Sequence, residues 1–216
     1  MSLKIIAAAF LLALPAAGAE PPLPTLRIEP TAGGSIFYVK NVSSIPLTAY
    51  VIELVDYPGS SYALFQDEIT SQPIAPEKEK RIQVSNMTVG AVPDYVKLRA
   101  AIYADGTTAG LPEKIAQLLA RRQFTLDTVR DVIRRVELGQ QTKTPKDTLT
   151  ANLRQAIEFM TLPPGFDKSS QVAINQSAGR AVLTEAAGYL DMHSPEDTIT
   201  RYRGLEKTLA DSKPRS

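Results

Sequence analysis

This sequence of 216 residues contains no cysteine, no tryptophan and a single histidine, His193. Without cysteine the chain has no disulfide, no thiolate nucleophile and no attachment point for the lipid of a bacterial lipoprotein. One histidine and no cysteine also argue against a zinc site, which draws mainly on these two residue types. The folded protein must therefore be stabilised by burial of its core.

Neither sign of charge is in excess, because 24 basic residues face 23 acidic ones. Nucleic-acid binding rests on neutralising phosphates, so this balance argues against a nucleic-acid partner. The sequence also lacks a nucleotide-binding glycine loop, a G-x-S-x-G serine elbow and an EF-hand calcium loop. We accordingly assign no catalytic, cofactor-binding or metal-binding residue from the sequence.

The longest apolar run lies at the N-terminus, at residues 5–14. A basic residue precedes it, and Ala17 and Ala19 supply the small residues of a cleavage site before Glu20. A membrane-spanning helix needs roughly 20 apolar residues, about twice this run. The pattern predicts a signal peptide at residues 1–19 and a secreted or periplasmic mature protein without a membrane span.

The half of the chain that follows alternates apolar and polar side chains, which is typical of strands with one buried face. In the clearest case Leu98 and Ile102 are predicted to point into a core, whereas Lys97 and Arg99 point into solvent. The predicted strands are 25–29, 34–40, 47–55, 62–66, 80–86 and 95–104. Turns rich in Gly, Pro, Asn and Ser separate them. This pattern predicts an antiparallel, immunoglobulin-like β-sandwich.

From Pro112 onward the apolar residues recur with the period of an α-helix. Five helices are predicted: one from Pro112, a second capped by Thr125 and ending before Gly139, a third from Thr144 to Pro163, a fourth at 170–192 and a fifth capped by Ser194. The expected fold class is therefore α+β. We expect a sandwich domain at 20–110, a helical region at 111–210 and a disordered tail at 211–216.

Carboxylates near predicted turns of the sandwich are one candidate for chemistry: Asp56, Asp67, Glu68, Asp94 and Asp105. A glycosidase needs two carboxylates held across a sugar cleft, and the sequence alone does not bring any two together. Solvated turn residues are the simpler interpretation. His193 lies beside Ser194 at the entry to a helix, where we expect an exposed polar residue rather than a general base.

The densest basic stretch contains five arginines: Arg121, Arg122, Arg130, Arg134 and Arg135. Asp127 and Asp131 lie one helical turn before the last three. Charges of both signs at this spacing are typical of a solvated, ion-paired helix face. A site for a phosphate or an acidic partner is the alternative.

Two runs, Lys40–Tyr50 and Ile102–Gly110, carry a resemblance to a known group. The first joins two predicted strands through an Asn-x-Ser turn and a proline, and the second leads from a strand through Asp-Gly into a helix. Both are similar to patterns in exported bacterial β-sandwich proteins of unknown function. The resemblance implies a sandwich in the N-terminal half, but no activity and no functional residue.

These observations favour a non-enzymatic protein that binds or organises a partner in the cell envelope or outside the cell. We expect the partner to be another envelope or extracellular protein, because sandwiches expose strand edges that accept a partner strand. The alternative is a carboxylate-dependent hydrolase acting on carbohydrate or cell-wall material. No cofactor is expected for either function.

Overall fold

The structure is a computed structural model that describes residues 20–55, 62–85 and 93–212. The predicted signal peptide and Asp56 lie outside these residues. The elements in chain order are β1 (Thr25–Thr31), β2 (Gly34–Lys40), β3 (Leu47–Leu54), β4 (Ala63–Asp67), β5 (Glu79–Ser85), a short 3-10 helix (Pro93–Tyr95), β6 (Val96–Tyr103), β7 (Thr108–Gly110), α1 (Pro112–Gln141), α2 (Lys146–Phe159), α3 (Gln171–Met192) and α4 (Pro195–Asp211).

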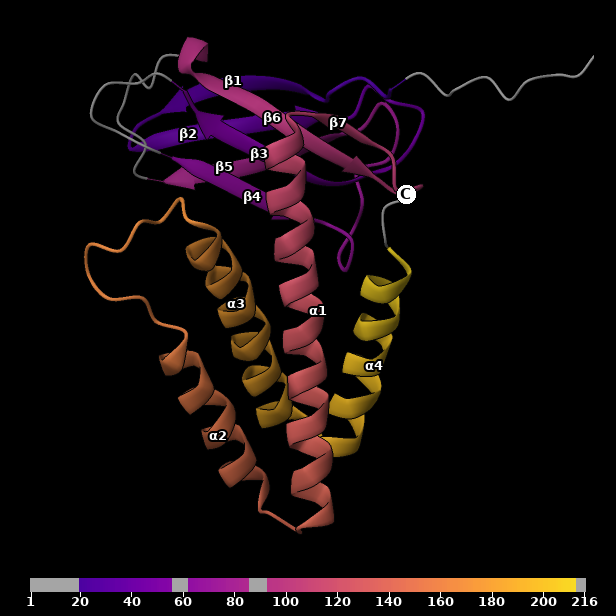
Figure 1. Cartoon of the computed structure of the whole chain (residues 1–216), viewed down its shortest axis with the longest axis vertical. Coiled ribbons are helices and arrows are strands. Elements are labelled where there is room, and N and C mark those ends of the chain that lie inside the picture. Colours follow the sequence, from indigo (N-terminus) through magenta and orange to yellow (C-terminus); the bar gives the residue numbers. More distant parts are fainter. Residues whose placement is uncertain (1–19, 56–61, 86–92, 213–216) are drawn as a thin grey trace, which may run out of the picture.

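The strands form two antiparallel sheets that pack face to face, as the alternating pattern predicts (Figure 1). The first sheet has the order β1-β2-β5 and the second has the order β4-β3-β6-β7. The core between them takes Phe37 and Val39 from the first sheet and Tyr50 and Ile52 from the second, all fully buried. The predicted α+β class, with the sandwich before the helices, is confirmed.

The turn between β2 and β3 is held by Asn41, which is completely buried. Its amide nitrogen donates to the carbonyl oxygens of Ile45 and Ile74 at 2.9 and 2.8 Å, and its amide oxygen accepts from the Ser43 backbone N–H at 3.0 Å. These bonds satisfy the polar backbone of a buried turn. Asn41 therefore ties the turn after β2 to the segment between β4 and β5.

A seventh strand, β7, was missed by the sequence pattern because it is only three residues long. It pairs antiparallel with β6, and Gly110 lies opposite Ala100. A Cβ at Gly110 would lie 2.3 Å from the carbonyl oxygen of Arg99, and its φ is +99°. Glycine is thus required where the chain leaves the sheet to enter α1.

The alternation predicted for β6 is wrong in its second half. Val51 pairs with Ala100, but the next residue of β3, Ile52, pairs with Leu98, so Arg99 is the extra residue of a bulge. A bulge moves the following side chains to the other face of the sheet. Leu98 consequently packs half-buried on the sandwich core, whereas Ile102 is fully buried on the opposite face, against α1.

The first two predicted helices are one helix, α1, of 30 residues. Thr125 does not cap a new helix, because its hydroxyl donates to the Arg121 carbonyl oxygen at 3.0 Å within the continuing helix. Gly139 does not end it either. A Cβ at Gly139 would lie 2.2 Å from Leu149, so this glycine allows close contact with α2. A threonine such as Thr125 does not start a new helix when no Gly or Pro ends the preceding helix before it.

The later helices begin as predicted in two cases of three. The hydroxyls of Ser170 and Ser194 accept hydrogen bonds from the backbone N–H of Ala173 and Asp197, which confirms the predicted Ser194 cap and identifies Ser170 as the cap of α3. Thr144 makes no such bond, and α2 begins at Lys146 and ends at Phe159, before the predicted stop. At the C-terminus α4 includes Asp211, which was expected in a disordered tail.

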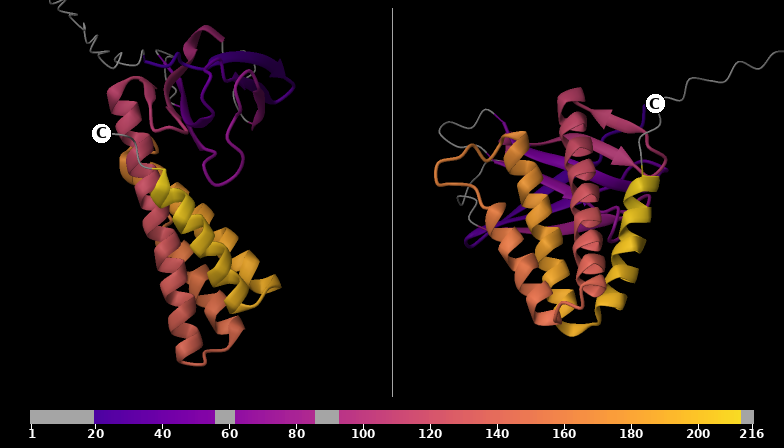
Figure 2. Two further views of the ribbon diagram at one scale, coloured as in Figure 1. Left: turned by 90° about the vertical axis from the view of Figure 1, so that its right-hand side faces the viewer. Right: turned by 60° about the horizontal axis from the view of Figure 1, so that its bottom comes forward.

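The long helix α1 lies at the centre of the helical region (Figure 1). Its first turns lie on the second sheet, and the rest extends beyond the sandwich between α3 and α4. The helix α2 packs on the far side of α3, and the four helices spread apart toward the sandwich (Figure 2). A single helix therefore belongs to the packing of both halves of the molecule.

Candidate functional site

The junction of the two halves is formed by the outer face of the second sheet and one stripe of α1. Ile115, Leu118 and Leu119 of α1 pack on small and β-branched residues of the sheet. These sheet residues are Ala49, Val51, Ala100 and Ile102, together with Phe65. The small side chains among them allow the axis of α1 to approach the sheet closely. The contact between α1 and the sheet is therefore close, and the residues that form it are apolar.

A buried ion pair closes the same junction. The Arg122 guanidinium binds the Asp67 carboxylate through two bonds, Nε to Oδ2 at 2.8 Å and Nη2 to Oδ1 at 2.9 Å. The same Nη2 donates to the Thr48 hydroxyl at 3.2 Å, and Nη1 donates to the Ser212 carbonyl oxygen at 3.4 Å. Arg122 is only 5% exposed. A planar two-point contact of this kind fixes orientation as well as distance.

This pair corrects two predictions. Asp67 was expected to be a solvated turn residue, and Arg122 to lie on a solvated helix face. The stripe of α1 that faces the sheet includes position 122, three and four residues after Leu119 and Leu118, so its side chain enters the junction. The sequence does contain one signal for the burial of Arg122: a charged residue continues the apolar stripe formed by Leu118 and Leu119.

Glu68 was also expected in solvent, yet it is 3% exposed. Its Oε1 lies 2.5 Å from the Lys80 ammonium on β5, and its Oε2 accepts from the Ser71 hydroxyl at 2.8 Å. The neighbouring Tyr50 hydroxyl is buried and has no hydrogen-bond partner among the described residues. Burial raises the pKa of Tyr50, and the Glu68 carboxylate adds to this shift. This cluster joins the two sheets at one edge.

Asp67 and Glu68 therefore serve different contacts on opposite sides of the second sheet. Asp67 binds α1 on the outer side, whereas Glu68 binds β5 of the other sheet. Two carboxylates that point away from each other cannot flank one glycosidic bond. Of the other predicted candidates, Asp94 is exposed, and Asp105 accepts from the Thr107 backbone N–H and hydroxyl within its turn. Asp67, Glu68 and Asp105 thus each make a contact that stabilises the fold itself.

His193 lies between α3 and α4 as predicted, but it is half-buried rather than free. Its ring stacks on Tyr189 with centroids 3.8 Å apart, and Nδ1 donates to the Tyr189 carbonyl oxygen at 3.0 Å. Ser194 beside it caps α4. These contacts explain the position of the histidine by local packing.

Within residues 20–55, 62–85 and 93–212, no group of three or more His, Cys, Asp or Glu side chains could hold a metal ion. None of the helices described is long and apolar enough to cross a membrane.

The clearest feature for recognition is a groove of about 450 Å³ between α1 and α2, which we call the α1–α2 groove. It is lined by Arg134, Arg135, Val136, Leu138, Gly139, Thr142, Thr144, Leu149, Asn152, Leu153, Gln155, Ala156 and Phe159. Leu149, Leu153 and Val136 are buried and form its floor. The two helices meet at the turn that follows α1 and diverge toward the sandwich, which opens the groove between them (Figure 1).

Two large apolar side chains of this groove face solvent. Phe159 is 79% exposed and Leu138 is 54% exposed. Arg134 and Arg135 lie beside them, and both pair with the single carboxylate of Asp131. The lining itself contains no carboxylate. The groove thus combines an apolar floor with an excess of positive charge, and two of the five arginines of the basic stretch line it.

Comparisons of this chain with protein-family models, with curated proteins and with solved structures find no match.

Proposed function

We propose that this chain is an exported, non-enzymatic binding protein whose α1–α2 groove receives an acidic amphipathic helix of another envelope or extracellular protein. The observation that carries the proposal is the groove itself, with Phe159 and Leu138 exposed beside two arginines. Large apolar side chains gathered at one exposed place mark interaction sites more often than scattered ones do. Export rests on the signal-like N-terminus of the sequence.

A helix is the partner element that suits this groove best. Both walls are helices, and their lining residues recur every three or four positions. The ridges of a third helix pack well into such a groove, as in bundles of helices. A guest helix would cover Leu138 and Phe159 with its apolar stripe, the mode used by many helix-in-groove complexes.

The charge of the groove favours an acidic guest. Arg134 and Arg135 share one carboxylate, Asp131, so one positive charge is left without a matching negative one. The side chain of Arg134 is 71% exposed and free to turn toward a ligand. Acidic residues beside the apolar stripe of the guest would pair with these guanidinium groups and fix the direction in which it lies.

The coupling of sandwich and helices also supports a binding role. Arg122 and the apolar stripe of α1 hold the helical region on the second sheet. The sandwich can then serve as a rigid base from which the helices extend (Figure 2). Binding sites held by rigid elements lose less conformational freedom when a partner binds.

The test uses three designed helical peptides with the same apolar stripe and with acidic, basic or neutral flanks. We expect the acidic peptide to bind the mature protein at least tenfold more tightly than the basic one. A double substitution, Arg134→Glu with Arg135→Glu, should reverse this order, and Phe159→Ala should weaken all three peptides. Lys207→Glu on α4, an exposed cation outside the groove, is the matched control.

Fluorescence anisotropy of labelled peptides gives these affinities. Equal affinity for the three peptides, or no effect of the arginine reversal, would overturn the proposal. Export is tested separately by the intact mass of the protein recovered outside the cytoplasm, which should begin at Glu20. A mass that still includes residues 1–19 would refute the cleavage site.

A further inference from the structure

A second and larger hollow lies between α3 and the connection that joins α2 to α3. Its volume is about 1010 Å³. Residues 160–168 of the connection form one wall, and α3 forms the other. In Figure 1 this connection bends away from the helices before it returns to the start of α3. The hollow is separate from the α1–α2 groove, and no lining residue is shared between them.

The connection supplies an apolar and stiff wall. Leu162 and Phe166 line the hollow, and Phe166 is 37% exposed. Pro163 and Pro164 between them fix the backbone, because proline restricts its own φ and the conformation of the preceding residue. Opposite them, α3 presents small side chains such as Ala181. Small residues facing large ones leave space that a ligand can fill.

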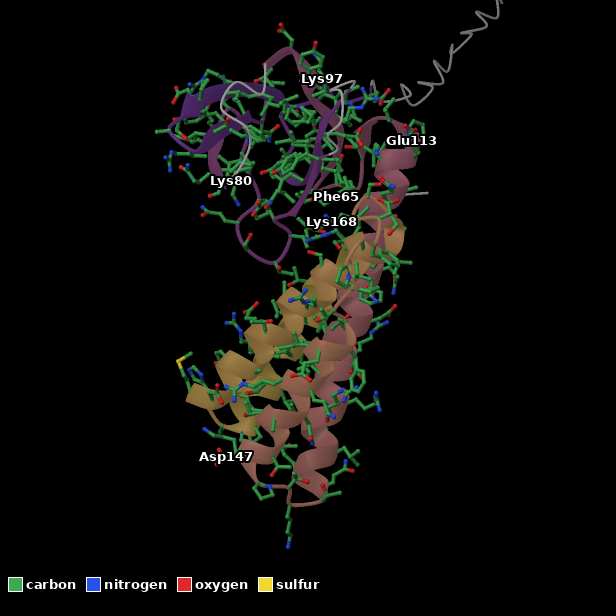
Figure 3. All side chains as sticks on the ribbon, turned by 90° about the vertical axis from the view of Figure 1, so that its left-hand side faces the viewer. Phe65, Lys80, Lys97, Glu113, Asp147 and Lys168 are labelled. Atoms are coloured by element: carbon green, nitrogen blue, oxygen red, sulfur yellow. The ribbon has the colours of Figure 1, made fainter. Side chains whose placement is uncertain are left out.

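Two cations, Lys168 and Arg180, line the same hollow. Lys168 lies on the connection at the end of the helical region that faces the sandwich (Figure 3). Neither has an ion-pair partner among the residues described. Glu185, the one carboxylate of the lining, is already paired with Arg201 of α4 at 2.5 Å.

Arg180 is an exception among the exposed arginines of the helical region. The other six are each paired with a carboxylate: Arg130, Arg134, Arg135, Arg154, Arg201 and Arg203. Arg180 instead lies at the hollow with its charge unmatched. The wall also holds Gln176, whose amide oxygen is shielded from solvent and has no hydrogen-bond partner within the described part of the chain. An amide oxygen only accepts hydrogen bonds, so water rather than a carboxylate would satisfy it.

We infer that this hollow binds a single-chain amphiphile with an anionic head, such as a free long-chain carboxylate. The alkyl chain would lie on Leu162 and Phe166, and the carboxylate would pair with Arg180 and Lys168. The volume of the hollow is close to that of small-molecule sites, which are mostly apolar with a few convergent polar groups. A guanidinium can bind a carboxylate through two parallel bonds, which gives the site directional preference. The inference does not depend on the proposed function of the α1–α2 groove.

Isothermal titration with decanoate, below its micelle concentration, tests this inference on the mature protein. We expect saturable binding of one decanoate per chain, no binding of acetate, and at least tenfold weaker binding of decanol. Arg180→Gln and Lys168→Gln should each weaken decanoate binding about tenfold, and Ala181→Phe should weaken it by taking up space between α3 and the apolar wall. Lys207→Gln on α4 is the matched control and should leave binding unchanged.

Unsaturable uptake, or unchanged affinity in the Arg180→Gln/Lys168→Gln double variant, would overturn the inference. A further arm measures sedimentation with vesicles of phosphatidylglycerol. Binding to these vesicles without binding of decanoate would also overturn it, in favour of a membrane-surface site. The double variant should keep its affinity for the acidic peptide, so failure of this inference and failure of the proposed function are distinguishable.

Discussion

The sandwich and the helical region differ in how much of their large apolar side chains they expose to solvent. The sandwich buries its large residues between two sheets, and Phe37, Tyr50 and Ile52 are completely inaccessible. Of the six large apolar side chains exposed in the described residues, five lie in the helical region: Leu138, Phe159, Phe166, Val172 and Met192. The difference supports the proposal that the sandwich is a support and that the helices bind the partner.

The physical reason lies in how the two kinds of element meet. Hydrogen bonds hold neighbouring strands at a fixed spacing, so two facing sheets close over each other along their whole length. Helices are held only by side chains, and those of this chain diverge from their shared turns (Figure 2). Diverging helices leave the groove between α1 and α2, and the connection from α2 to α3 leaves the second hollow against α3.

Ion pairs differ between the junction of the two regions and the helical surface. Arg122 and Asp67 are almost completely buried, with side chains 6% and 10% exposed. The pairs that link the helices, such as Arg130 with Glu206, are largely in solvent. Solvated pairs contribute little and are weakened by salt, whereas breaking a buried pair leaves a charge without compensation. The junction should therefore be far more sensitive to substitution than the helical surface.

The largest effect is expected for Asp67→Ala. This change leaves the Arg122 guanidinium buried without its carboxylate and should lower the free energy of unfolding by about 3–5 kcal/mol. Glu206→Ala removes an exposed pair and should cost at most about 1 kcal/mol. Urea unfolding followed by circular dichroism measures both. Equal losses would show that the junction pair is not the stronger one.

The next effect distinguishes the two faces of β6. Ile102→Ala should cost about 2–5 kcal/mol, because the side chain is fully buried against α1. Leu98→Ala should cost less, since Leu98 is only half-buried, and Lys97→Ala should cost little. If Leu98→Ala destabilises more than Ile102→Ala in urea, the bulge at Arg99 is misplaced.

A smaller effect is expected at the helix cap. Ser194→Ala should lower stability by about 1 kcal/mol, because the first turn of α4 loses the hydrogen bond to the Asp197 N–H. Thr144→Ala provides the comparison, since Thr144 makes no capping bond to α2 and its loss should be smaller. Thermal unfolding of the two variants checks this, and equal shifts in Tm would argue against the Ser194 cap.

The smallest effect is expected for His193→Ala on ligand binding. The histidine stacks on Tyr189 and lines neither the α1–α2 groove nor the hollow beside α3. Peptide and decanoate affinities should therefore stay within about twofold, which corresponds to a few tenths of a kcal/mol. A loss of a hundredfold or more in any enzymatic turnover, with the fold intact, would instead make His193 a general acid or base.

The sequence by itself determined the local elements. The strand β2 appears at its predicted residues, 34–40, because turns with strong glycine and asparagine signals bound it on both sides. The helix α3 begins and ends where predicted because Ser170 caps it and a new capped helix starts directly after it. Such boundaries depend on groups that are close in sequence, and therefore a single sequence contains enough information to place them.

Only the tertiary structure decided which side chains meet across the molecule. The bulge at Arg99 reversed the face of Ile102, and packing on the second sheet drew Arg122 and Asp67 out of solvent. The α1–α2 groove depends on the angle at which two helices diverge. These features are set by distances between residues far apart in the chain, and periodicity within one segment contains no information about them.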